Sequence, residues 1–369
     1  MNSRAAGLAL ALLLPVATPL AAQRVAFEAL GDVEGWETDS ASRLLSRNNG
    51  EAAWLTRVHA WLTWRAARAL EVVALGAGEA GTAFDESDMS GHVEVYGTLE
   101  LLAARYRPCR TIGLEAGKSL MPIGTFGARH FSDVNPLIGQ PDMYPPQYPW
   151  GAMASGAAGP FDWRAGVMSL PAVNTGYTPV PEHRLRPVAG AGVSVGPSFH
   201  AGVSGTYGPY LGSRYAPQLP SGTEWTDFAQ TIVAGDARVS AGYVEVRAEV
   251  AWSSYEVPTK SDPVEGVGWY GEARVTLSPR VFAAARVEQF RYPFILPINQ
   301  FFWVGSTTTE RNAEIGAGYR WTPDLLLKLS LRKDHWPEPH PVGVQLLDGY
   351  ALAAQLSWHV RPGDVIGRR

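Results

Sequence analysis

Residues 242–252 read GYVEVRAEVAW, and the charges in this stretch fall on alternate positions. One parity holds Val244, Val246, Ala248, Val250 and Trp252, and the other holds Glu245, Arg247, Glu249 and Ala251. Successive side chains of a β-strand point to opposite faces, so this segment predicts a strand with one apolar and one charged face. The pattern by itself leaves open whether the apolar face meets a protein core or lipid.

The same alternation recurs along the chain and carries a length signal. In residues 54–65, Trp54 and Trp64 bracket an apolar face, while Arg57 and Arg65 take the opposite parity. At about 3.3 Å per residue the two tryptophans are roughly 33 Å apart along a strand. A tilt of about 40° turns this into roughly 25 Å of height, the apolar band of an outer-membrane barrel.

Short and long connections alternate between the predicted strands. The strands are expected at residues 26–38, 53–66, 69–79, 91–105, 110–120, 149–157, 160–170, 186–196, 198–208, 226–237, 242–253, 266–277, 281–292, 311–321, 324–335 and 347–360. Tight turns rich in Gly, Pro and Ser join them on one side, and longer loops join them on the other. This layout predicts an all-β fold, a transmembrane antiparallel β-barrel of about 16 strands with short periplasmic turns and long extracellular loops. The apolar faces mix Ala, Gly and Val, which fill a soluble sandwich core poorly but suit acyl chains.

Composition and charge exclude several classes of protein. The chain has 369 residues, of which 46% are apolar and 18% charged, and no stretch after residue 22 approaches the length of an apolar membrane helix. A net charge of −4 gives no basic footprint for nucleic acid. Residues 1–22, with Arg4 before an apolar run, predict a signal peptide, and residues 23–369 predict one barrel in the outer membrane of a Gram-negative bacterium.

Three short motifs resemble catalytic or metal sites, but their spacing or their predicted structural context does not fit such a site. Residues 113–119, GLEAGKS, have one residue too few between their glycines for a phosphate-binding loop. Residues 192–196, GVSVG, match a nucleophile elbow, but Ser194 lies inside an alternating strand and not on a strand-to-helix turn. Residues 334–340, DHWPEPH, predict a solvated loop, with a weak metal contact as the alternative. We therefore predict no enzymatic activity, no cofactor and no metal.

Charged residues of both signs fall on the parity that faces the lumen. The pore-lining candidates are Arg57, Arg65, Arg164, Glu245, Arg247, Glu249, Arg274, Arg286, Arg320 and Lys328. Together with the other acidic residues of this parity the charges nearly balance, and many are expected to pair across neighbouring strands. Such a wall stays hydrated and passes polar solutes without marked preference for anions or cations.

The loop at residues 121–148 is the candidate constriction. It is long and carries apolar residues such as Ile123, Phe126 and Leu137, so exposure to water would be costly. Folding inward would bury this surface and bring charged groups toward the pore axis. The constriction candidates are Lys118, Arg129, His130, Asp133 and Asp142. The alternative is a loop that packs over the rim or against a neighbouring subunit.

Several short patches resemble the phosphate-selective porin O and P family. They are Gly117-Lys118 with Pro122-Ile123-Gly124, Asn135-Pro136-Leu137-Ile138-Gly139, Gly235-Asp236-Ala237-Arg238, Gly268-Trp269-Tyr270-Gly271-Glu272 and Gly316-Ala317-Gly318-Tyr319-Arg320. The resemblance implies a sixteen-stranded, trimeric pore with an infolded third loop. Family members that select phosphate carry a lysine cluster in the constriction, whereas residues 121–148 contain no lysine.

The expected function is passive diffusion of small hydrophilic solutes or ions across the outer membrane, with anions such as phosphate among the candidates. The expected partners are outer-membrane lipid, these solutes and further copies of the chain in a homotrimer, with no nucleic acid. Two alternatives remain open at this point: a barrel that does not conduct, such as a receptor, adhesin or scaffold, and an outer-membrane hydrolase that uses Ser194.

Overall fold

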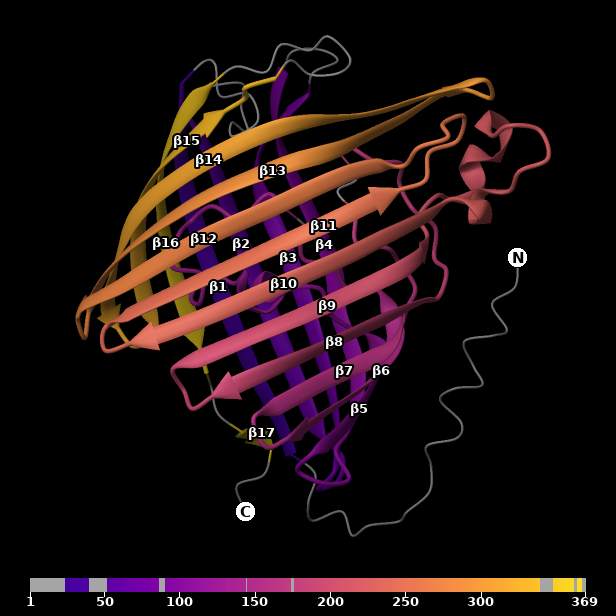
Figure 1. Ribbon diagram of the computed structural model, residues 1–369. Coiled ribbons are helices and arrows are strands. Elements are labelled where there is room, and N and C mark those ends of the chain that lie inside the picture. The colour runs from indigo at the N-terminus through magenta and orange to yellow at the C-terminus, as the bar shows by residue number, and fades with distance from the viewer. Residues whose placement is uncertain are drawn as a thin grey trace.

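The computed structural model describes residues 24–39, 52–85, 90–143, 145–173, 176–338, 348–361 and 364–366 (Figure 1). The predicted signal peptide at residues 1–22 and His340 of the candidate metal loop lie outside the described residues. Among the residues that are described, no helix has the length and apolar character needed to cross a membrane.

Sixteen antiparallel strands close into one barrel, and a seventeenth short strand adds to the seam. The strands are β1 Arg24–Thr38, β2 Ala53–Arg65, β3 Leu70–Asp85, β4 Ser90–Tyr106, β5 Ile112–Lys118, β6 Trp150–Ala158, β7 Phe161–Met168, β8 Arg186–Val195, β9 Phe199–Pro209, β10 Ala229–Ala241, β11 Val244–Tyr255, β12 Val264–Ser278, β13 Val281–Asn299, β14 Phe302–Thr322, β15 Leu325–His335, β16 Gly349–Val360 and β17 Asp364–Ile366. Closure follows from β1, which pairs with both β2 and β16. A closed sheet has no free edge, and free edges cannot stay unpaired in hydrocarbon.

The outward and inward faces of the barrel have inverted polarity relative to a soluble protein. On β15, Leu327, Leu329 and Leu331 are 42%, 54% and 43% exposed, while Lys328 and Arg332, which have the opposite parity, are buried. The opening segment behaves in the same way, because the valines of β11 face outward and Glu249 is buried. Exposed leucines and buried charges indicate a lipid-facing outer surface and a polar lumen. The lipid-facing parity predicted from the sequence is confirmed.

Short turns connect the strands on one side, at residues 159–160, 196–198, 242–243, 279–280 and 323–324. One connection on the other side differs from the prediction. Residues 293–310 were expected to form a loop, but β13 runs on to Asn299 and β14 starts at Phe302, so the two strands extend beyond the rim as a hairpin (Figure 1).

Two prolines lie in this hairpin and are compatible with it. Pro293 pairs with Thr307, and Pro297 pairs with Trp303, across the β13–β14 ladder. The register between β12 and β13 ends at Arg291, so beyond that residue β13 pairs with β14 alone. Proline lacks an N–H donor and is tolerated on such an edge. Buried Ile295 and Trp303 pack with Tyr210 and Leu211, which supports the extension from the neighbouring loop.

Three short 3-10 helices complete the described structure: η2 Phe126–Arg129, η3 Ser213–Gln218 and η4 Trp225–Asp227. The first of them lies in the loop between β5 and β6, which is the predicted constriction loop. The other two lie between β9 and β10, above the rim.

Candidate functional site

The connection between β5 and β6, residues 119–149 and here called the inner loop, folds into the lumen. Backbone N–H groups of Ile138 and Gly139 donate to Glu314 of β14 at 3.2 and 2.9 Å. Lys328 of β15 donates to the carbonyls of Asn135 and Leu137, both at 3.0 Å. These wall residues face the barrel interior, so the inner loop lies inside the barrel and not over the rim.

The first half of the inner loop is fastened to β11 and β12. Arg129 donates to Glu272 at 2.7 Å and to the Tyr270 hydroxyl at 2.8 Å. Tyr270 in turn donates to Glu249 at 2.8 Å, and the backbone N–H of Thr125 donates to the same carboxylate at 2.9 Å. Arg129 is only 5% exposed. The prediction that it points toward the pore axis is therefore wrong, because its guanidinium is held against the wall by the two acceptors.

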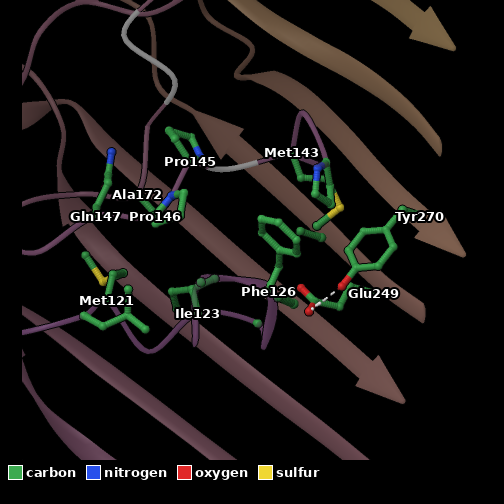
Figure 2. A pocket seen from close by; sticks show the side chains of 16 residues that line it. Met121, Ile123, Phe126, Met143, Pro145, Pro146, Gln147, Ala172, Glu249 and Tyr270 are labelled. Carbon is green, nitrogen blue, oxygen red and sulfur yellow. Dashed lines mark hydrogen bonds between the residues drawn. The ribbon is translucent and has the colours of Figure 1, made fainter. Parts of the chain in front are cut away.

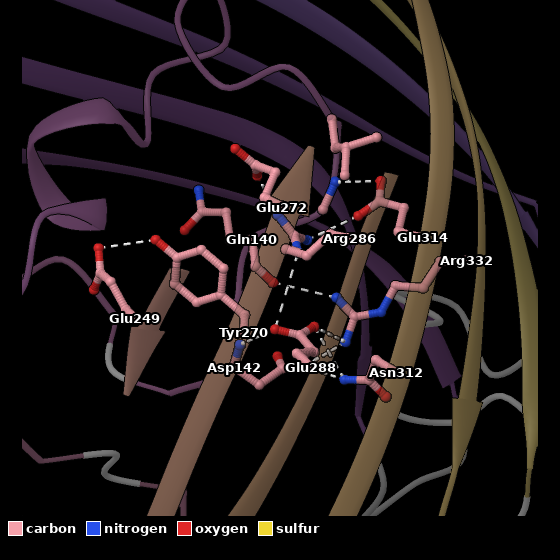
Figure 3. Close-up of polar contacts among 12 residues, drawn as sticks. Gln140, Asp142, Glu249, Tyr270, Glu272, Arg286, Glu288, Asn312, Glu314 and Arg332 are labelled. Carbon is pink, nitrogen blue, oxygen red and sulfur yellow. Dashed lines mark hydrogen bonds and ion pairs between the residues drawn. The ribbon is translucent and has the colours of Figure 1, made fainter. Parts of the chain in front are cut away.

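The second half of the inner loop ends in a buried cluster of charges (Figure 3). Arg332 of β15 pairs with Asp142 of the loop and with Asp334 at 2.9 Å. Asn312 donates to Asp142 at 2.5 Å, and the backbone N–H of Asp142 donates to Glu288 at 3.2 Å. Asp142 is thus tied to the wall by Arg332, which also faces Glu288, Glu310 and Asp334. Its side chain is 31% exposed, so the structure keeps Asp142 as a constriction candidate.

Apolar packing fills the space between the inner loop and strands β10–β12 (Figure 2). Met121, Ile123, Phe126 and Met143 of the loop face Ala234, Ala251 and Tyr270 of the wall. The cavity left between them has a volume of about 30 Å³. Such a space holds about one or two water molecules. The inner loop therefore closes this side of the lumen.

A larger space lies on the opposite side, between the inner loop and strands β1–β4. This space, here called the lateral cavity, has a volume of about 200 Å³. Its lining includes Asp32, Arg57, His59, Glu79, Tyr96, Thr98 and Glu100 from the wall and His130, Phe131 and Tyr148 from the loop. Arg57 is paired with Asp32 at 3.1 Å and also with Glu34. Polar groups therefore line the side of the lumen that the inner loop leaves open.

Of two further constriction candidates, His130 lines the lateral cavity, and Asp133 lies against β14 and β16. His130 Nδ1 donates to the Gly127 carbonyl at 2.6 Å. Burial lowers the pKa of His130 to about 4, because desolvation disfavours the imidazolium, so the ring is neutral at neutral pH. Asp133 faces His359 of β16, with 3.1 Å between its carboxylate and Nδ1, and its carbonyl accepts from Arg320 at 3.3 Å.

Lys118 does not join the constriction. In the register of β4, β5 and β6 it lies beside Leu102 and Trp150, whose side chains are exposed on the outer face. Its ammonium donates to the carbonyl of Leu99. The sequence misled here because β5 ends at Lys118 with the outward parity of Leu114 and Ala116, and this parity was not applied to the last residue.

The pore-lining candidates divide into covered and open residues. Glu249, Arg286 and Lys328 are buried and do not line open space. Glu249 and Lys328 bind the inner loop directly, whereas Arg286 pairs with Glu314 of the wall. The open candidates are half-buried or exposed on the lumen face, and they are Arg57, Arg65, Arg164, Glu245, Arg247, Arg274 and Arg320. Two of these pair within one strand, since Arg247 donates to Glu245 at 2.8 Å. Arg164 donates to the Gly124 carbonyl at 3.3 Å.

Comparison with known proteins bears on the fold. No protein-family model and no curated protein matches the sequence. A loop L8 deletion mutant of OmpT, an outer membrane protein of Vibrio cholerae, matches over 91% of this chain and 100% of its own length, with a TM-score of 0.55 and 10% identity. This chain therefore has the fold of an outer-membrane β-barrel. In-vitro folded OmpT in its trimer form matches over 92% of this chain and 99% of its own length, with a TM-score of 0.54 and 8% identity.

The prediction that this barrel has no enzymatic activity is corrected. Two further structures of OmpT match as well, and at 8–10% identity these four structures share the fold without fixing an activity for this chain. The prediction had rested on Ser194 lying outside a strand-to-helix turn, which the structure bears out. Yet Ser194 lies 3.0 Å from His200 Nδ1, and His200 Nε2 lies 3.4 Å from Asp236. A serine, a histidine and an aspartate are the groups of a hydrolytic triad, but here Nδ1 faces the serine and Nε2 the aspartate, the reverse of the usual triad.

Sequence reasoning also missed a group of three side chains in the lateral cavity. His59 of β2, Glu100 of β4 and His130 of the inner loop offer ligand atoms within 4.8 Å of one another. Glu100 is the extra residue at a register shift, because Leu75 pairs with Leu101 while Gly76 pairs with Leu99. A β-bulge of this kind redirects a side chain and leaves no sequence signature. The only sequence signal was that His59 and Glu100 share the lumen side.

Proposed function

We propose that this barrel forms a narrow, water-filled channel through which small hydrophilic solutes or ions diffuse across the outer membrane. The observation that carries the proposal is the asymmetric placement of the inner loop. On the β10–β12 side about 30 Å³ remains free, whereas the lateral cavity beside β1–β4 holds about 200 Å³. An inward loop that leaves one polar side open is a means of setting pore size and selectivity.

The charges of the lateral cavity favour cations over anions such as phosphate. Three carboxylates line it, from Asp32, Glu79 and Glu100, against the single guanidinium of Arg57. Lys118, the lysine nearest to the inner loop in sequence, lies on the outward parity. A ring of carboxylates attracts cations and repels anions. We therefore propose a weakly cation-selective pore. Membership in the phosphate-selective porin O and P family stays a proposal that rests on the short sequence patches alone.

We also propose that the chain assembles as a homotrimer in the outer membrane. The support is twofold: the sequence resemblance implies a trimer, and one matched OmpT structure is of a trimer form. Crosslinking of the protein in native outer-membrane vesicles, followed by electrophoresis without heating, tests this assembly. A band at three times the monomer mass is expected, and a monomer band alone would contradict it.

Conductance in planar bilayers tests the channel itself. Purified full-length protein, folded as shown by a heat-dependent shift in electrophoretic mobility, should give stable open steps in KCl. A KCl gradient should give a reversal potential that corresponds to cation preference. Silence from well-folded protein would instead support the alternative of a non-conducting receptor, adhesin or scaffold, a reading favoured by the dense buried packing of the inner loop.

A hydrolytic activity is a second candidate, favoured by the contact of Ser194 with His200 and of His200 with Asp236. A histidine between a hydroxyl and a carboxylate can act as a general base toward the hydroxyl. Hydrolysis of a small water-soluble ester by the folded barrel tests it. Activity that disappears in Ser194→Ala supports this function, and activity equal in the wild type and in Ser194→Ala excludes Ser194 as the nucleophile.

A further inference from the structure

Three segments that are distant in sequence bring metal-ligating side chains together in the lateral cavity. His59 comes from β2, Glu100 from the bulge of β4 and His130 from the inner loop just after η2. One ligand atom from each lies within 4.8 Å of the other two. His59 Nε2 and Glu100 Oε2 are 3.9 Å apart, which is too long for a hydrogen bond.

The polar atoms of this cluster are buried but poorly satisfied within the protein. His59 is 7% exposed, and its Nδ1 finds no hydrogen-bond partner among the described residues. Glu100 Oε2 is likewise buried without a partner in the described part of the chain. Buried polar atoms are nearly always paired, so such orphans at one place point to a missing partner.

His130 is already held in the orientation that a metal ligand needs. Its Nδ1–H donates to the Gly127 carbonyl at 2.6 Å, so the neutral ring carries its lone pair on Nε2. A histidine that donates its other N–H to a backbone carbonyl is the usual arrangement around bound metals, because it fixes the tautomer and the ring direction. Phe131 packs edge-on against His59, with 5.2 Å between ring centroids and an interplanar angle of 89°, which limits solvent access.

We propose that His59, Glu100 and His130 form a binding site for a divalent transition-metal ion such as Zn²⁺. Two imidazoles and one carboxylate are a zinc ligand set that leaves a coordination position open for water. Mg²⁺ and Ca²⁺ prefer sites made of oxygen ligands, so this set discriminates against them. Tetrahedral bonds of about 2.0 Å would place the ligand atoms about 3.3 Å apart. Small side-chain rotations therefore have to draw the cluster together.

The charges around the cluster are compatible with a cation. Glu79 and Asp32 line the same cavity, and Asp133 follows His130 by three residues in the inner loop. Two cations lie near the cluster: Arg57 is already paired with Asp32 and Glu34, and the Lys118 ammonium, which donates to the Leu99 carbonyl, interacts with the Glu100 carboxylate. A metal bound here would tie the inner loop to β2 and β4 across the lateral cavity. This last consequence rests on the proposed channel function: Zn²⁺ should narrow the pore and lower its conductance.

Calorimetric titration of the detergent-folded full-length barrel with Zn²⁺ tests the site directly. The wild type should bind one Zn²⁺ per chain and no Mg²⁺. Loss of a ligand in His59→Ala, Glu100→Gln or His130→Ala should weaken the affinity by at least about 10-fold, the lower end of what even an outer partner of a metal site contributes. The matched control is His92→Ala, which removes an exposed histidine near the start of β4, outside the cluster. Each variant is first checked for the heat-dependent mobility shift of a folded barrel.

The possible outcomes separate the metal site from the channel. Binding by the wild type and His92→Ala that is lost in the three cluster variants supports the site. Equal affinity in all variants, or no binding by the wild type, overturns it. Conductance recorded before and after Zn²⁺, and again after addition of EDTA, reports the effect on the pore. Zn²⁺ binding by a barrel that never conducts would support the metal site and contradict the channel. Conductance by a barrel that does not bind Zn²⁺ would support the channel and contradict the metal site.

Discussion

Removal of the Glu314 carboxylate should release the inner loop from the barrel wall. This buried side chain accepts the N–H groups of Ile138 and Gly139 at 3.2 and 2.9 Å and also accepts from Arg286 at 2.8 Å. A hydrogen bond to a charged group contributes about 1.5–3 kcal/mol. Loss of the two loop contacts in Glu314→Ala should therefore destabilise the docked loop by about 3–6 kcal/mol, which raises the undocked population by a factor of about 10²–10⁴.

Hydrogen exchange followed by mass spectrometry measures this change. The informative amides are those of Val134 and Asn135, which donate to the Phe131 carbonyl at 3.0 and 2.8 Å and do not contact Glu314. They should exchange faster in Glu314→Ala only if the loop leaves the wall as a unit, because exchange reports the opening equilibrium. Glu314→Gln keeps an acceptor oxygen and should show a smaller acceleration.

The matched control removes a lumen carboxylate that does not hold the loop. Glu245 accepts from Arg247 at 2.8 Å on β11 and is half-buried. Glu245→Ala should leave the exchange of Val134 and Asn135 unchanged. Wild-type protection of these two amides in Glu314→Ala would refute the reasoning, because it would show that Glu314 does not anchor the loop.

Three further predictions concern the pore and the membrane face. Deletion of residues 125–138 should raise single-channel conductance, because the inner loop occupies the lumen; unchanged conductance would place the narrowest point elsewhere. Glu79→Gln removes a carboxylate from the lateral cavity and should shift the reversal potential in a KCl gradient toward anions, and a constant potential would place Glu79 off the ion path. Val250→Arg puts a charge on the lipid face and should cost about 2–4 kcal/mol in urea unfolding from vesicles, against about 0–1 kcal/mol for Tyr243→Arg in a turn. Equal costs for the two arginines would contradict the assigned membrane position.

Arg129 illustrates why contacts within the lumen escape a sequence-based prediction. Its position in the infolded loop suggested a pore-facing cation, yet Glu272 and Tyr270 hold it against the wall. These partners are more than 140 residues away in sequence, so no local pattern records them. The same holds for Asp142, which pairs with Arg332 across 190 residues.

The sequence by itself determined the barrel and the alternation of its strands, and it favoured an inward fold of the long loop over a position at the rim. A membrane strand alternates lipid-facing and lumen-facing residues. Apolar and polar residues therefore alternate with a period of two within each strand segment, as in residues 244–252. Only the tertiary structure decided which lumen charges meet. Closure of the sheet and the bulge at Glu100 place ligand atoms of His59, Glu100 and His130 within 4.8 Å of one another. The inner loop packs against the β10–β12 side of the lumen. These outcomes depend on strand register and on packing between distant segments, which the local alternation does not encode.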